Sequence, residues 1–413
     1  MIQYQRYVLP NGLTVILHPD ADSRLGVVNI LYRAGSVYEQ ADNTGIAHLF
    51  EHMMFSGTPS VRDFDTPIQK AGGENNAFTS NDYANYYSHA PVENLSLLLW
   101  LEADRMKNLL LKSSDLTIQK SVVTEEFYET SIEQPFADFW HLISPLAYSR
   151  HHYRWPVIGA EPRHIARINL KQIKNWYRQF YRIDNAILCV AGNINVEKIK
   201  AEINDTFGKI KQSPLKNKLP SITSEPFQRK RRSMQVNRDV PANAIYIAFP
   251  IPARRNKDFY TIDIIADLLS SGKSSRLHER LIKKKKLFFN IDVFTNDVAG
   301  PGLLIIQAKL SDGVDMQSAE AAIIHELNEL QETLVSKTEL SKVINKTLTS
   351  IEFSEYSIVN KAINLAYFEY IGDISLINRE IEIYKKITQI EIQKGSRKIF
   401  RPDHINVLYY FKN

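Results

Sequence analysis

The segment His48-Leu49-Phe50-Glu51-His52 constrains this chain more than any other stretch of its sequence. It has the pattern H-x-x-E-H. In an α-helix, His48 and His52 lie one turn apart on the same face, so that their imidazoles can share one divalent metal ion. Glu51 then lies beside them, where its carboxylate can take a proton from a water molecule on the metal. The motif therefore requires a helix and predicts a metal centre, with zinc as the usual ion.

The residues around the motif favour a short helix. Either Thr44 or Asn43 is the expected N-cap, and Gly57 is a suitable place for the helical segment to stop. The alternative is a helix that carries two structural histidines and a solvated glutamate. A single histidine would favour that alternative, whereas two histidines and a glutamate at this spacing favour metal binding.

Length and composition limit the kind of protein. A chain of 413 residues exceeds one ordinary hydrophobic core, so two domains are expected. The content of 44% hydrophobic and 23% charged residues is typical of a globular protein. Basic runs at 229–232 and 283–286 lack interleaved aromatic residues, so no nucleic-acid partner is predicted despite a net charge of +5.

The single cysteine and the N-terminus restrict the chemistry and the location. Cys189 alone excludes disulfides within the chain and cysteine ligation of a cluster, and its apolar neighbours predict a buried strand. No apolar stretch is long enough to span a membrane, and the first residues lack the apolar region of a signal peptide. We therefore expect a cytoplasmic protein without a membrane partner, or a periplasmic one if a signal peptide was removed.

The order of predicted elements occurs twice along the chain. The first half has predicted strands at 13–18, 26–34, 75–80, 84–90 and 186–192, and predicted helices over the motif, from about 92 to 111, from Ser114 onward and up to about Phe207. The second half has predicted strands near 232–237, 243–250, 287–309 and 405–411, with a helix at about 258–271.

A stretch rich in Lys, Ser and Pro at 211–226 is the predicted linker between two domains, 1–210 and 227–413. Each half is expected to be an α+β unit with an antiparallel-rich sheet covered by helices, and the two halves are expected to be homologous. Only the first half carries H-x-x-E-H, so we expect the first domain to bind the metal.

A catalytic zinc site needs a third protein ligand. Such a site holds three protein ligands and keeps one position open. The helix after Ser114 offers three carboxylates for that role, Glu125, Glu126 and Glu129.

At this point the sequence resembles a known family, the pitrilysin-type (inverzincin) zinc peptidases, which include insulin-degrading enzyme and the mitochondrial processing peptidase. The resemblance covers most of the chain and is strongest to short two-domain members, such as the catalytic subunit of that processing peptidase and bacterial heterodimeric peptidases. It implies a chain that forms one side of a clam-shell chamber. The segments that carry it are 9–13, 45–58, 72–79 with Asp82 and Tyr86, 122–126, 156–159 and 274–277.

The resemblance also implies roles for individual residues. The family's third zinc ligand aligns with Glu126, 74 positions after His52, and Glu129 is the alternative one turn further on. Glu51 is the general base that activates water for peptide hydrolysis. The substrate peptide pairs through its backbone with an edge strand that contains Asn76 and Ala77.

Three positions carry a residue that differs from the one usual in the family, and a fourth, Phe55, carries a residue like that of the family. Ile282 and Phe289 stand where the family has an Arg and a Tyr that reach the substrate and the developing oxyanion, and neither side chain can donate a hydrogen bond. Gln119 stands where the family often has a Glu; it can form a hydrogen bond but cannot act as a base. Phe55 resembles a family residue that lines the site, although it could equally belong to the core.

These departures suggest a partner. The resemblance implies a heterodimer in which a homologous subunit without H-x-x-E-H supplies the missing Arg/Tyr pair. Drift in a weak enzyme, or a homodimer that uses other residues, are the alternatives. The predicted function is that of a zinc-dependent endopeptidase subunit that cleaves peptides or short unfolded segments, against the alternatives of a scaffold subunit and a peptide-binding module.

Overall fold

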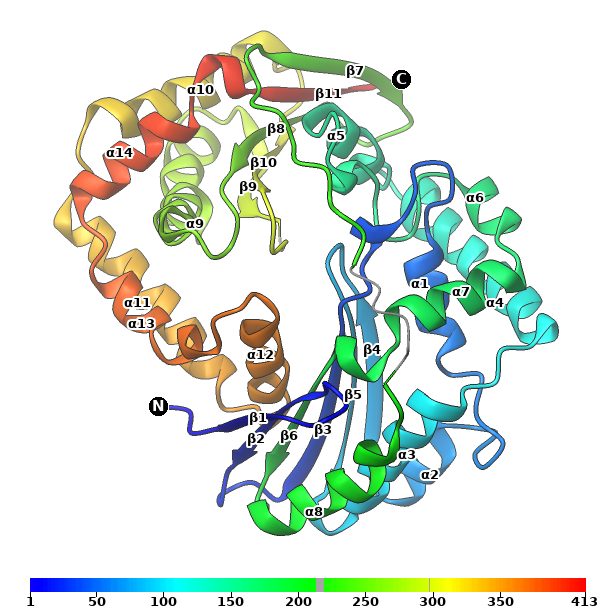
Figure 1. Cartoon of the computed structure of the whole chain (residues 1–413). Helices are drawn as coiled ribbons and strands as arrows, with labels where there is room; N and C mark the ends of the chain where they lie inside the picture. Colours follow the sequence, from blue (N-terminus) through cyan, green and yellow to red (C-terminus); the bar gives the residue numbers. More distant parts are fainter. Residues whose placement is uncertain (213–218, 297) are drawn as a thin grey trace. The chain divides into compact units, whose positions relative to one another are not determined.

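The computed structural model describes residues 1–212, 219–296 and 298–413, which form two compact units (Figure 1). Unit 1 consists of Met1–Tyr128, Trp155–Ile222 and Glu352–Arg379. Unit 2 consists of Glu129–Arg154, Thr223–Ile351 and Glu380–Asn413. Each unit has its own β-sheet with helices packed on it, which confirms the predicted α+β class.

The sheet of unit 1 has the strand order β1-β2-β6-β3-β5-β4. Only β2 and β6 run parallel, and the other neighbours are antiparallel. Strand β6 is buried along its whole length, as expected for the apolar run around Cys189, whereas β4 lies at the sheet edge. The strands are β1 (Gln5–Val8), β2 (Thr14–Pro19), β3 (Leu25–Tyr32), β4 (Glu74–Thr79), β5 (Ala84–Pro91) and β6 (Ala186–Gly192).

The sheet of unit 2 has the strand order β7-β11-β8-β10-β9. Here β7 and β11 are parallel and the other neighbours are antiparallel, so the pairing repeats that of β2-β6-β3-β5-β4 strand by strand. This shared topology supports a duplicated unit, and it makes the edge strand β9 the counterpart of β4. The strands are β7 (Arg232–Arg238), β8 (Ala244–Ile251), β9 (Phe288–Thr295), β10 (Gly302–Leu310) and β11 (Asn406–Lys412).

The helices connect and cover these strands. Among the parts of the chain that the structure describes, no helix is long and apolar enough to cross a lipid bilayer. The helices of unit 1 are α1 (Ile46–Met53), α2 (Asp65–Lys70), α3 (Leu95–Asn108), α4 (Ser113–Tyr128), α6 (Pro162–Arg167), α7 (Leu170–Phe180), α8 (Val196–Thr206) and α12 (Ile358–Tyr370). Those of unit 2 are α5 (Phe139–Ala147), α9 (Lys257–Ser270), α10 (Met316–Glu332), α13 (Glu380–Lys385) and α14 (Gln389–Ile399), and α11 (Lys337–Ser354) runs from unit 2 into unit 1.

Two helix boundaries differ from the sequence expectation. The helix expected from about 92 to 111 is shorter, because Val92–Asn94 forms a 3₁₀ turn after Pro91 and α3 ends at Asn108. Ser114 does not cap α4. The helical bonding already starts at the carbonyl of Lys112, which accepts from the N–H of Leu116, so Ser114 lies inside the first turn.

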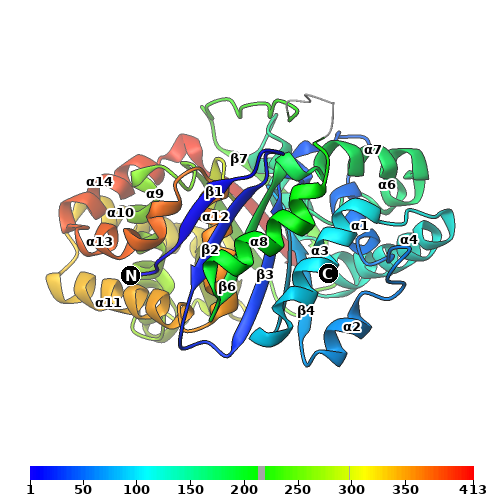
Figure 2. The same ribbon diagram turned by 60° about the horizontal axis from the view of Figure 1, so that its bottom comes forward.

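The two compact units do not coincide with the contiguous domains expected at 1–210 and 227–413. Residues 352–379 of the second half belong to unit 1, and residues 129–154 of the first half belong to unit 2. Helix α12 comes from the second half of the sequence but packs on β6 and β3 of unit 1, on the face opposite α8 (Figure 2). Helix α5 comes from the first half but packs on β7, β8 and β11 of unit 2. The expected linker, 211–226, includes residues 213–218, which lie outside the described residues.

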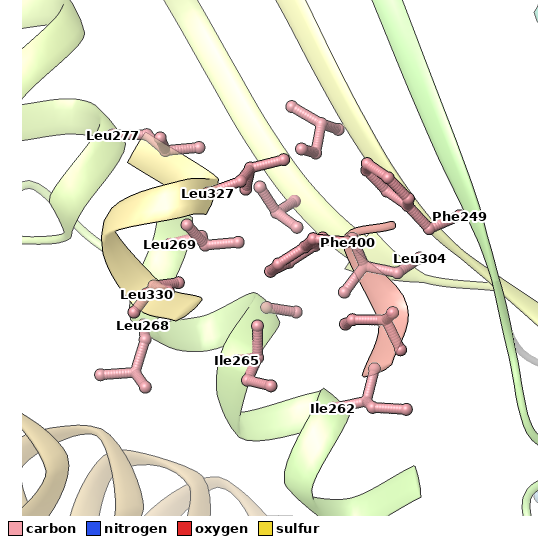
Figure 3. Close-up of a cluster of buried hydrophobic side chains, with 14 of the residues drawn as sticks. Phe249, Ile262, Ile265, Leu268, Leu269, Leu277, Leu304, Leu327, Leu330 and Phe400 are labelled. Carbon is pink, nitrogen blue, oxygen red and sulfur yellow. The ribbon is translucent and has the colours of Figure 1, made fainter. Parts of the chain in front are cut away.

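The core of unit 2 shows how its helices are held (Figure 3). Phe249 of β8 and Leu304 of β10 lie in one buried cluster with Ile265 and Leu269 of α9 and Leu327 of α10. Each of these side chains is almost inaccessible to solvent. Burial of a Leu, Ile or Phe side chain contributes about 1.5–3 kcal/mol, so each member of this cluster stabilises the packing of α9 and α10 on the sheet.

The exchange of α12 can be tested with a fragment. Residues 1–210 alone lack α12 and expose the apolar face of β3 and β6, so we expect no cooperative thermal transition in near-UV circular dichroism. Fusing residues 352–379 through a flexible linker should restore the transition. The same fusion with Leu365→Asp, which places a charge on the buried side of α12, should not restore it. A cooperative transition of 1–210 alone would contradict this account.

Candidate metal centre

Helix α1 places the two histidines of the motif as the sequence predicts. Its apolar side chains face inward, and His48 and His52 lie one turn apart with ring centroids separated by 4.9 Å. Neither Thr44 nor Asn43 caps the helix, so that expectation was wrong. The N-cap residue is Gly45, whose φ of 90° is easily adopted only by glycine. The hydroxyl of Thr44 instead accepts a hydrogen bond from the N–H of Ala160 at 2.7 Å.

A buried carboxylate outside the helix takes the place of the cap. Glu39 accepts hydrogen bonds from the backbone N–H groups of Gly45 and Ala47, at 3.0 and 2.9 Å. Burial raises the pKa of Glu39 to about 8, and these backbone donors oppose that rise. Capping rules consider only residues next to the helix, so they could not identify Glu39, which stands six residues before Gly45. Its side chain fixes where α1 begins.

Three side chains of unit 1 converge on one point. One ligand atom each from His48, His52 and Glu126 can be chosen so that all lie within 4.8 Å of one another. The Nε2 atoms of His48 and His52 lie 3.6 and 3.5 Å from the two carboxylate oxygens of Glu126. Two ligand atoms about 2.1 Å from a tetrahedral zinc ion would be about 3.4 Å apart, so the spacing fits such an ion.

Of the three glutamates that the sequence offers as third ligand, one lies close to the histidines. Glu126 points toward the histidines from α4, which packs on α1. Glu125 is exposed, and Glu129 is exposed at the start of the next segment. Within residues 1–212, 219–296 and 298–413, His48, His52 and Glu126 are the only cluster of this kind.

The protonation states of His48, His52 and Glu126 favour the binding of a cation. Burial lowers the pKa of His48 to about 4, so its imidazole is neutral at pH 7 and keeps a free lone pair. Burial also acts to lower the pKa of His52, but the hydrogen bond and the negative charge of Glu126 raise it overall. The same contact with His52 lowers the pKa of Glu126, which is therefore ionised. One carboxylate between two imidazoles is a typical catalytic zinc ligand set.

Glu51 lies beside the cluster and is tied to the edge strand β4. The hydroxyl of Thr79 donates a hydrogen bond of 2.5 Å to its carboxylate. Burial raises the pKa of Glu51, and the bond from Thr79 opposes that rise. A carboxylate with a raised pKa is a better proton acceptor at neutral pH than an ordinary glutamate. Sequence reasoning did not identify Thr79, because its contact with Glu51 depends on how α1 packs on β4.

Gln119 of α4 orients one of the histidines. Its side-chain oxygen lies 3.3 Å from Nδ1 of His52, so Nδ1–H is the donor, and a neutral His52 in this tautomer has its lone pair on Nε2, the atom that would bind a metal ion. Such a partner fixes the tautomer and the ring orientation of a metal-binding histidine. Gln119 and Phe55 also line a pocket of about 550 Å³ next to this centre.

Phe55 rests on a buried cationic side chain. The guanidinium of Arg105 lies 5.5 Å from the ring centre of Phe55, 4.1 Å from that of Phe64 and 4.8 Å from that of Tyr86. The buried carboxylate of Glu102 neutralises it at 2.7 Å. Phe55 itself is half-buried, so it is both a packing residue and part of the pocket wall. The sequence contained no signal for this aromatic cage.

Asn76 and Ala77 lie on β4, as expected, at the free edge of the sheet. Both are paired with β5 on one side only. The side-chain oxygen of Asn76 accepts a hydrogen bond of 2.8 Å from the exposed backbone N–H of Ala77. The edge is therefore accessible, and an added strand would replace this local hydrogen bond.

The two departures in the second half lie in unit 2. Ile282 belongs to the helical segment His278–Lys284 and is partly buried against the hydrophobic core of that unit. Phe289 lies on the edge strand β9 and is 55% exposed. Neither side chain carries a hydrogen-bond donor.

Comparison with known protein families agrees with this arrangement. Residues 14–158 match the family described as Insulinase (Peptidase family M16), and residues 167–347 match its companion described as Peptidase M16 inactive domain. The two matches together span more than half of the chain. The chain belongs to the peptidase M16 family. The resemblance inferred from the motifs is thereby confirmed, and H-x-x-E-H lies within the first match.

Relatives of this M16 protein are named as proteases. The zinc protease PqqE of Helicobacter pylori is 29% identical over 346 residues, which cover 83% of this chain and 78% of that one. A crystal structure of a protease from Helicobacter pylori has a TM-score of 0.94 at 24% identity and covers 100% of both chains. The periplasmic protease PqqL from Escherichia coli has a TM-score of 0.80 at 19% identity; the match covers 99% of this chain but 48% of PqqL. The two structures show a shared fold.

The choice of third ligand can be tested by metal content. Glu126→Ala should bind zinc at least about tenfold more weakly than the unmodified protein, because one of three ligands is lost. Glu129→Ala is the matched control and should keep full affinity. Competition with a chromophoric chelator measures both constants. Loss of zinc in Glu129→Ala with retention in Glu126→Ala would reverse the assignment.

The contact of Gln119 with His52 can be tested without changing any of the three metal ligands. Gln119→Leu keeps the size of the side chain but removes the acceptor for Nδ1–H of His52, so zinc affinity should fall about 10- to 100-fold. Gln119→Glu restores an acceptor and should bind zinc at least as tightly as the unmodified protein. Equal affinities for all three proteins would show that this contact does not orient His52.

Proposed function

We propose that this chain is the catalytic subunit of a zinc-dependent endopeptidase that hydrolyses peptides or short unfolded segments. The observation that carries the proposal is the convergence of His48, His52 and Glu126 with Glu51 beside them. The name of the Helicobacter pylori relative, a zinc protease, supports the same ion.

The residues of the chain suit each step of hydrolysis. Bound zinc supplies Lewis acidity and lowers the pKa of water toward about 7. Glu51 takes the proton of the attacking water and passes it to the leaving amine. Thr79 holds the carboxylate of Glu51 in place and favours its ionised form. Gln119 favours the neutral tautomer of His52 whose lone pair is on Nε2, the atom that would bind zinc.

The edge strand β4 is the proposed substrate-binding element. A peptide added alongside Asn76 and Ala77 pairs through backbone groups, which tolerates many side-chain sequences. Phe55 forms part of the wall of the pocket of about 550 Å³ and would contact a substrate side chain. This mode suits extended peptides and unfolded segments rather than folded proteins.

A homologous partner subunit is the second part of the proposal. Ile282 and Phe289 cannot stabilise a developing oxyanion, and loss of one such donor costs about 3–4 kcal/mol in activation free energy. PqqL is about twice as long as the matched region, which supports a functional unit with two copies of this fold. A partner of that fold with an Arg/Tyr pair would form a heterodimer with this chain.

The alternative is a peptide-binding or scaffold subunit with little activity alone. The description of the second match as an inactive domain and the apolar residues at 282 and 289 favour it. A scaffold subunit would not need the metal ligands, whereas a peptide-binding module would need the β4 edge but not Glu51. Metal content and turnover therefore separate the three functions.

Cleavage of a quenched fluorescent peptide library by the zinc-loaded chain is the decisive experiment. Glu51→Gln should lower the cleavage rate at least about 100-fold, because the general base is lost, while zinc content stays the same. Cleavage by the chain alone would refute the need for an Arg/Tyr partner. Bound zinc without any cleavage, alone or with a homologous partner, would refute the peptidase and leave peptide binding.

The hydrogen bond from Thr79 predicts a change in the pH profile. Since a donated hydrogen bond favours the ionised carboxylate, Thr79→Val should raise the pKa of Glu51. The acidic limb of kcat/KM should then move to higher pH, so that activity is lost first at low pH. Thr79→Ser keeps the hydroxyl and should retain the original profile. An unchanged limb in Thr79→Val would exclude Glu51 as the group that titrates there.

A further inference from the structure

Unit 2 contains a second pocket that the proposed peptidase chemistry does not use. We propose that it binds an amphipathic carboxylate, a small molecule with an apolar tail and an anionic head group. The pocket has a volume of about 930 Å³. All of its lining residues belong to unit 2, whereas His48, Glu51, His52 and Glu126 belong to unit 1.

The wall of the pocket is mainly apolar and is built on rigid elements. Ile251 ends β8, Leu303 is the second residue of β10, Ile262 lies on α9 and Ile399 ends α14. All four side chains are almost fully buried, and Ile262 is also part of the core shown in Figure 3. Pockets of about 300–1,000 Å³ with such walls are typical small-molecule sites. An apolar tail is the part of a ligand that these side chains would cover.

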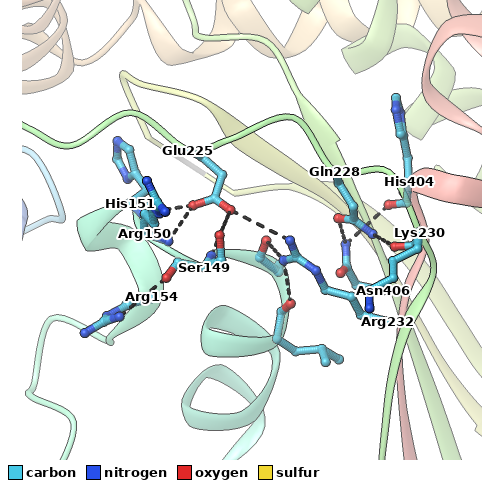
Figure 4. Close-up of polar contacts among 12 residues, drawn as sticks. Ser149, Arg150, His151, Arg154, Glu225, Gln228, Lys230, Arg232, His404 and Asn406 are labelled. Carbon is cyan, nitrogen blue, oxygen red and sulfur yellow. Dashed lines mark hydrogen bonds and ion pairs between the residues drawn. The ribbon is translucent and has the colours of Figure 1, made fainter.

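One side of the pocket is a short segment of extended chain, residues 225–228, that is held in place at both ends (Figure 4). The carboxylate of Glu225 accepts backbone hydrogen bonds of 2.8–2.9 Å from Ser149, Arg150 and His151. The side chain of Gln228 accepts from Asn406 at 3.0 Å and donates to the carbonyl of Ile405 at 3.2 Å. The pocket is therefore formed before a ligand arrives, which lowers the entropic cost of binding.

The acidic residues around the pocket are already used within the chain. Asp258 forms an ion pair with Lys398. Glu391 accepts hydrogen bonds from the N–H and the hydroxyl of Thr388, both at 2.8 Å. Glu225 is held by the three backbone N–H groups described above. All three carboxylates already have partners within the chain, and the lining holds five Lys and Arg side chains against these three carboxylates.

The residues that line the pocket include more basic than acidic side chains. Lys257, Lys386 and Lys394 line it and are exposed, and none of the three forms an ion pair or a side-chain hydrogen bond with any residue that the structure describes. Arg401, also in the lining, forms an ion pair with Asp403 at 2.8 Å and lies over the ring of Phe227 at 5.7 Å, and that ring is 64% exposed. Lys386 interacts electrostatically with the carboxylate of Glu382, whereas Lys257 and Lys394 have no such acidic neighbour among the described residues. An apolar cavity with a surplus of positive charge matches a ligand that is apolar at one end and anionic at the other.

The test is a fluorescence titration of the full chain with 11-(dansylamino)undecanoic acid. Saturable binding of one probe per chain is expected, with displacement by decanoate. Displacement should strengthen by about fourfold for each CH₂ group from hexanoate to decanoate. Decanol lacks the charge and should compete at least about tenfold less well than decanoate. No saturable binding, or equal competition by decanol, would overturn the proposal.

A charge-reversal pair locates the binding site. Lys386→Glu/Lys394→Glu should weaken decanoate binding at least about tenfold. Lys284→Glu/Lys337→Glu makes the same charge change elsewhere in unit 2 and should leave binding unchanged, with thermal melting as a check of folding for both. Equal binding by both variants would refute this pocket as the site. Displacement by a hexaglutamate peptide as strong as by decanoate would point to an acidic peptide and overturn the amphipathic ligand.

Zinc content and peptide cleavage are measured on the same preparations. Neither should change in Lys386→Glu/Lys394→Glu, since the metal ligands lie in unit 1. A failed titration with intact cleavage would refute only the ligand site, and intact titration without cleavage would refute only the peptidase. The two proposals therefore fail separately.

Discussion

The packing of α1 against α4 is the contact on which the rest of the candidate site depends. It brings Glu126 to within 3.6 Å of His48 and 3.5 Å of His52, although 74 positions separate Glu126 from the second histidine. Other contacts restrain α1 at each end: Glu39 holds its first N–H groups, and Thr79 and Gln119 hold Glu51 and His52. These restraints matter because a metal site that is loose by 1 Å loses affinity and activity. The arrangement is thus set by side chains from four different segments, of which the motif is only one.

The sequence could predict contacts between residues that are close in the chain, but not contacts that form only when distant segments pack together. His48, Glu51 and His52 could be predicted because helical periodicity alone places them on neighbouring positions of one surface. Glu126 could be predicted only from the need for a third ligand and from family resemblance, and Glu129 stayed open because it is three residues further along the chain. Glu39 and Thr79 could not be predicted, since each meets α1 through tertiary packing. The N-cap prediction failed for the same reason: capping rules consider neighbours in sequence, and here the acceptor comes from an earlier buried turn.

The fold shows the same division between local and tertiary information. Strand positions and the repeated order of elements could be predicted from alternation and turn residues, because each strand carries its own pattern. The exchange of α5 and α12 could not be predicted in this way. An amphipathic helix shows which of its faces is buried, but not which sheet it covers. Five strands of each sheet share one topology, so each sheet offers a similar apolar face. Only the packed structure shows that α5, from the first half of the sequence, covers the sheet of unit 2 and that α12, from the second half, covers the sheet of unit 1.

Five strands of each unit have the same pairing, but the corresponding edge strands β4 and β9 carry different chemistry. Strand β4 carries Thr79, which holds Glu51, whereas its counterpart β9 carries the exposed Phe289. Upstream of β9, Ile282 contributes to the core of unit 2, where an apolar side chain stabilises the fold but cannot serve an oxyanion. An exposed hydrophobic edge strand favours unwanted pairing, and charged residues next to it oppose that pairing. The lysines at 283–286 stand directly before β9, and Asp292 is exposed along it. At these two positions unit 2 therefore carries side chains that suit packing on the core and the edge of its sheet, and neither can donate a hydrogen bond to an oxyanion.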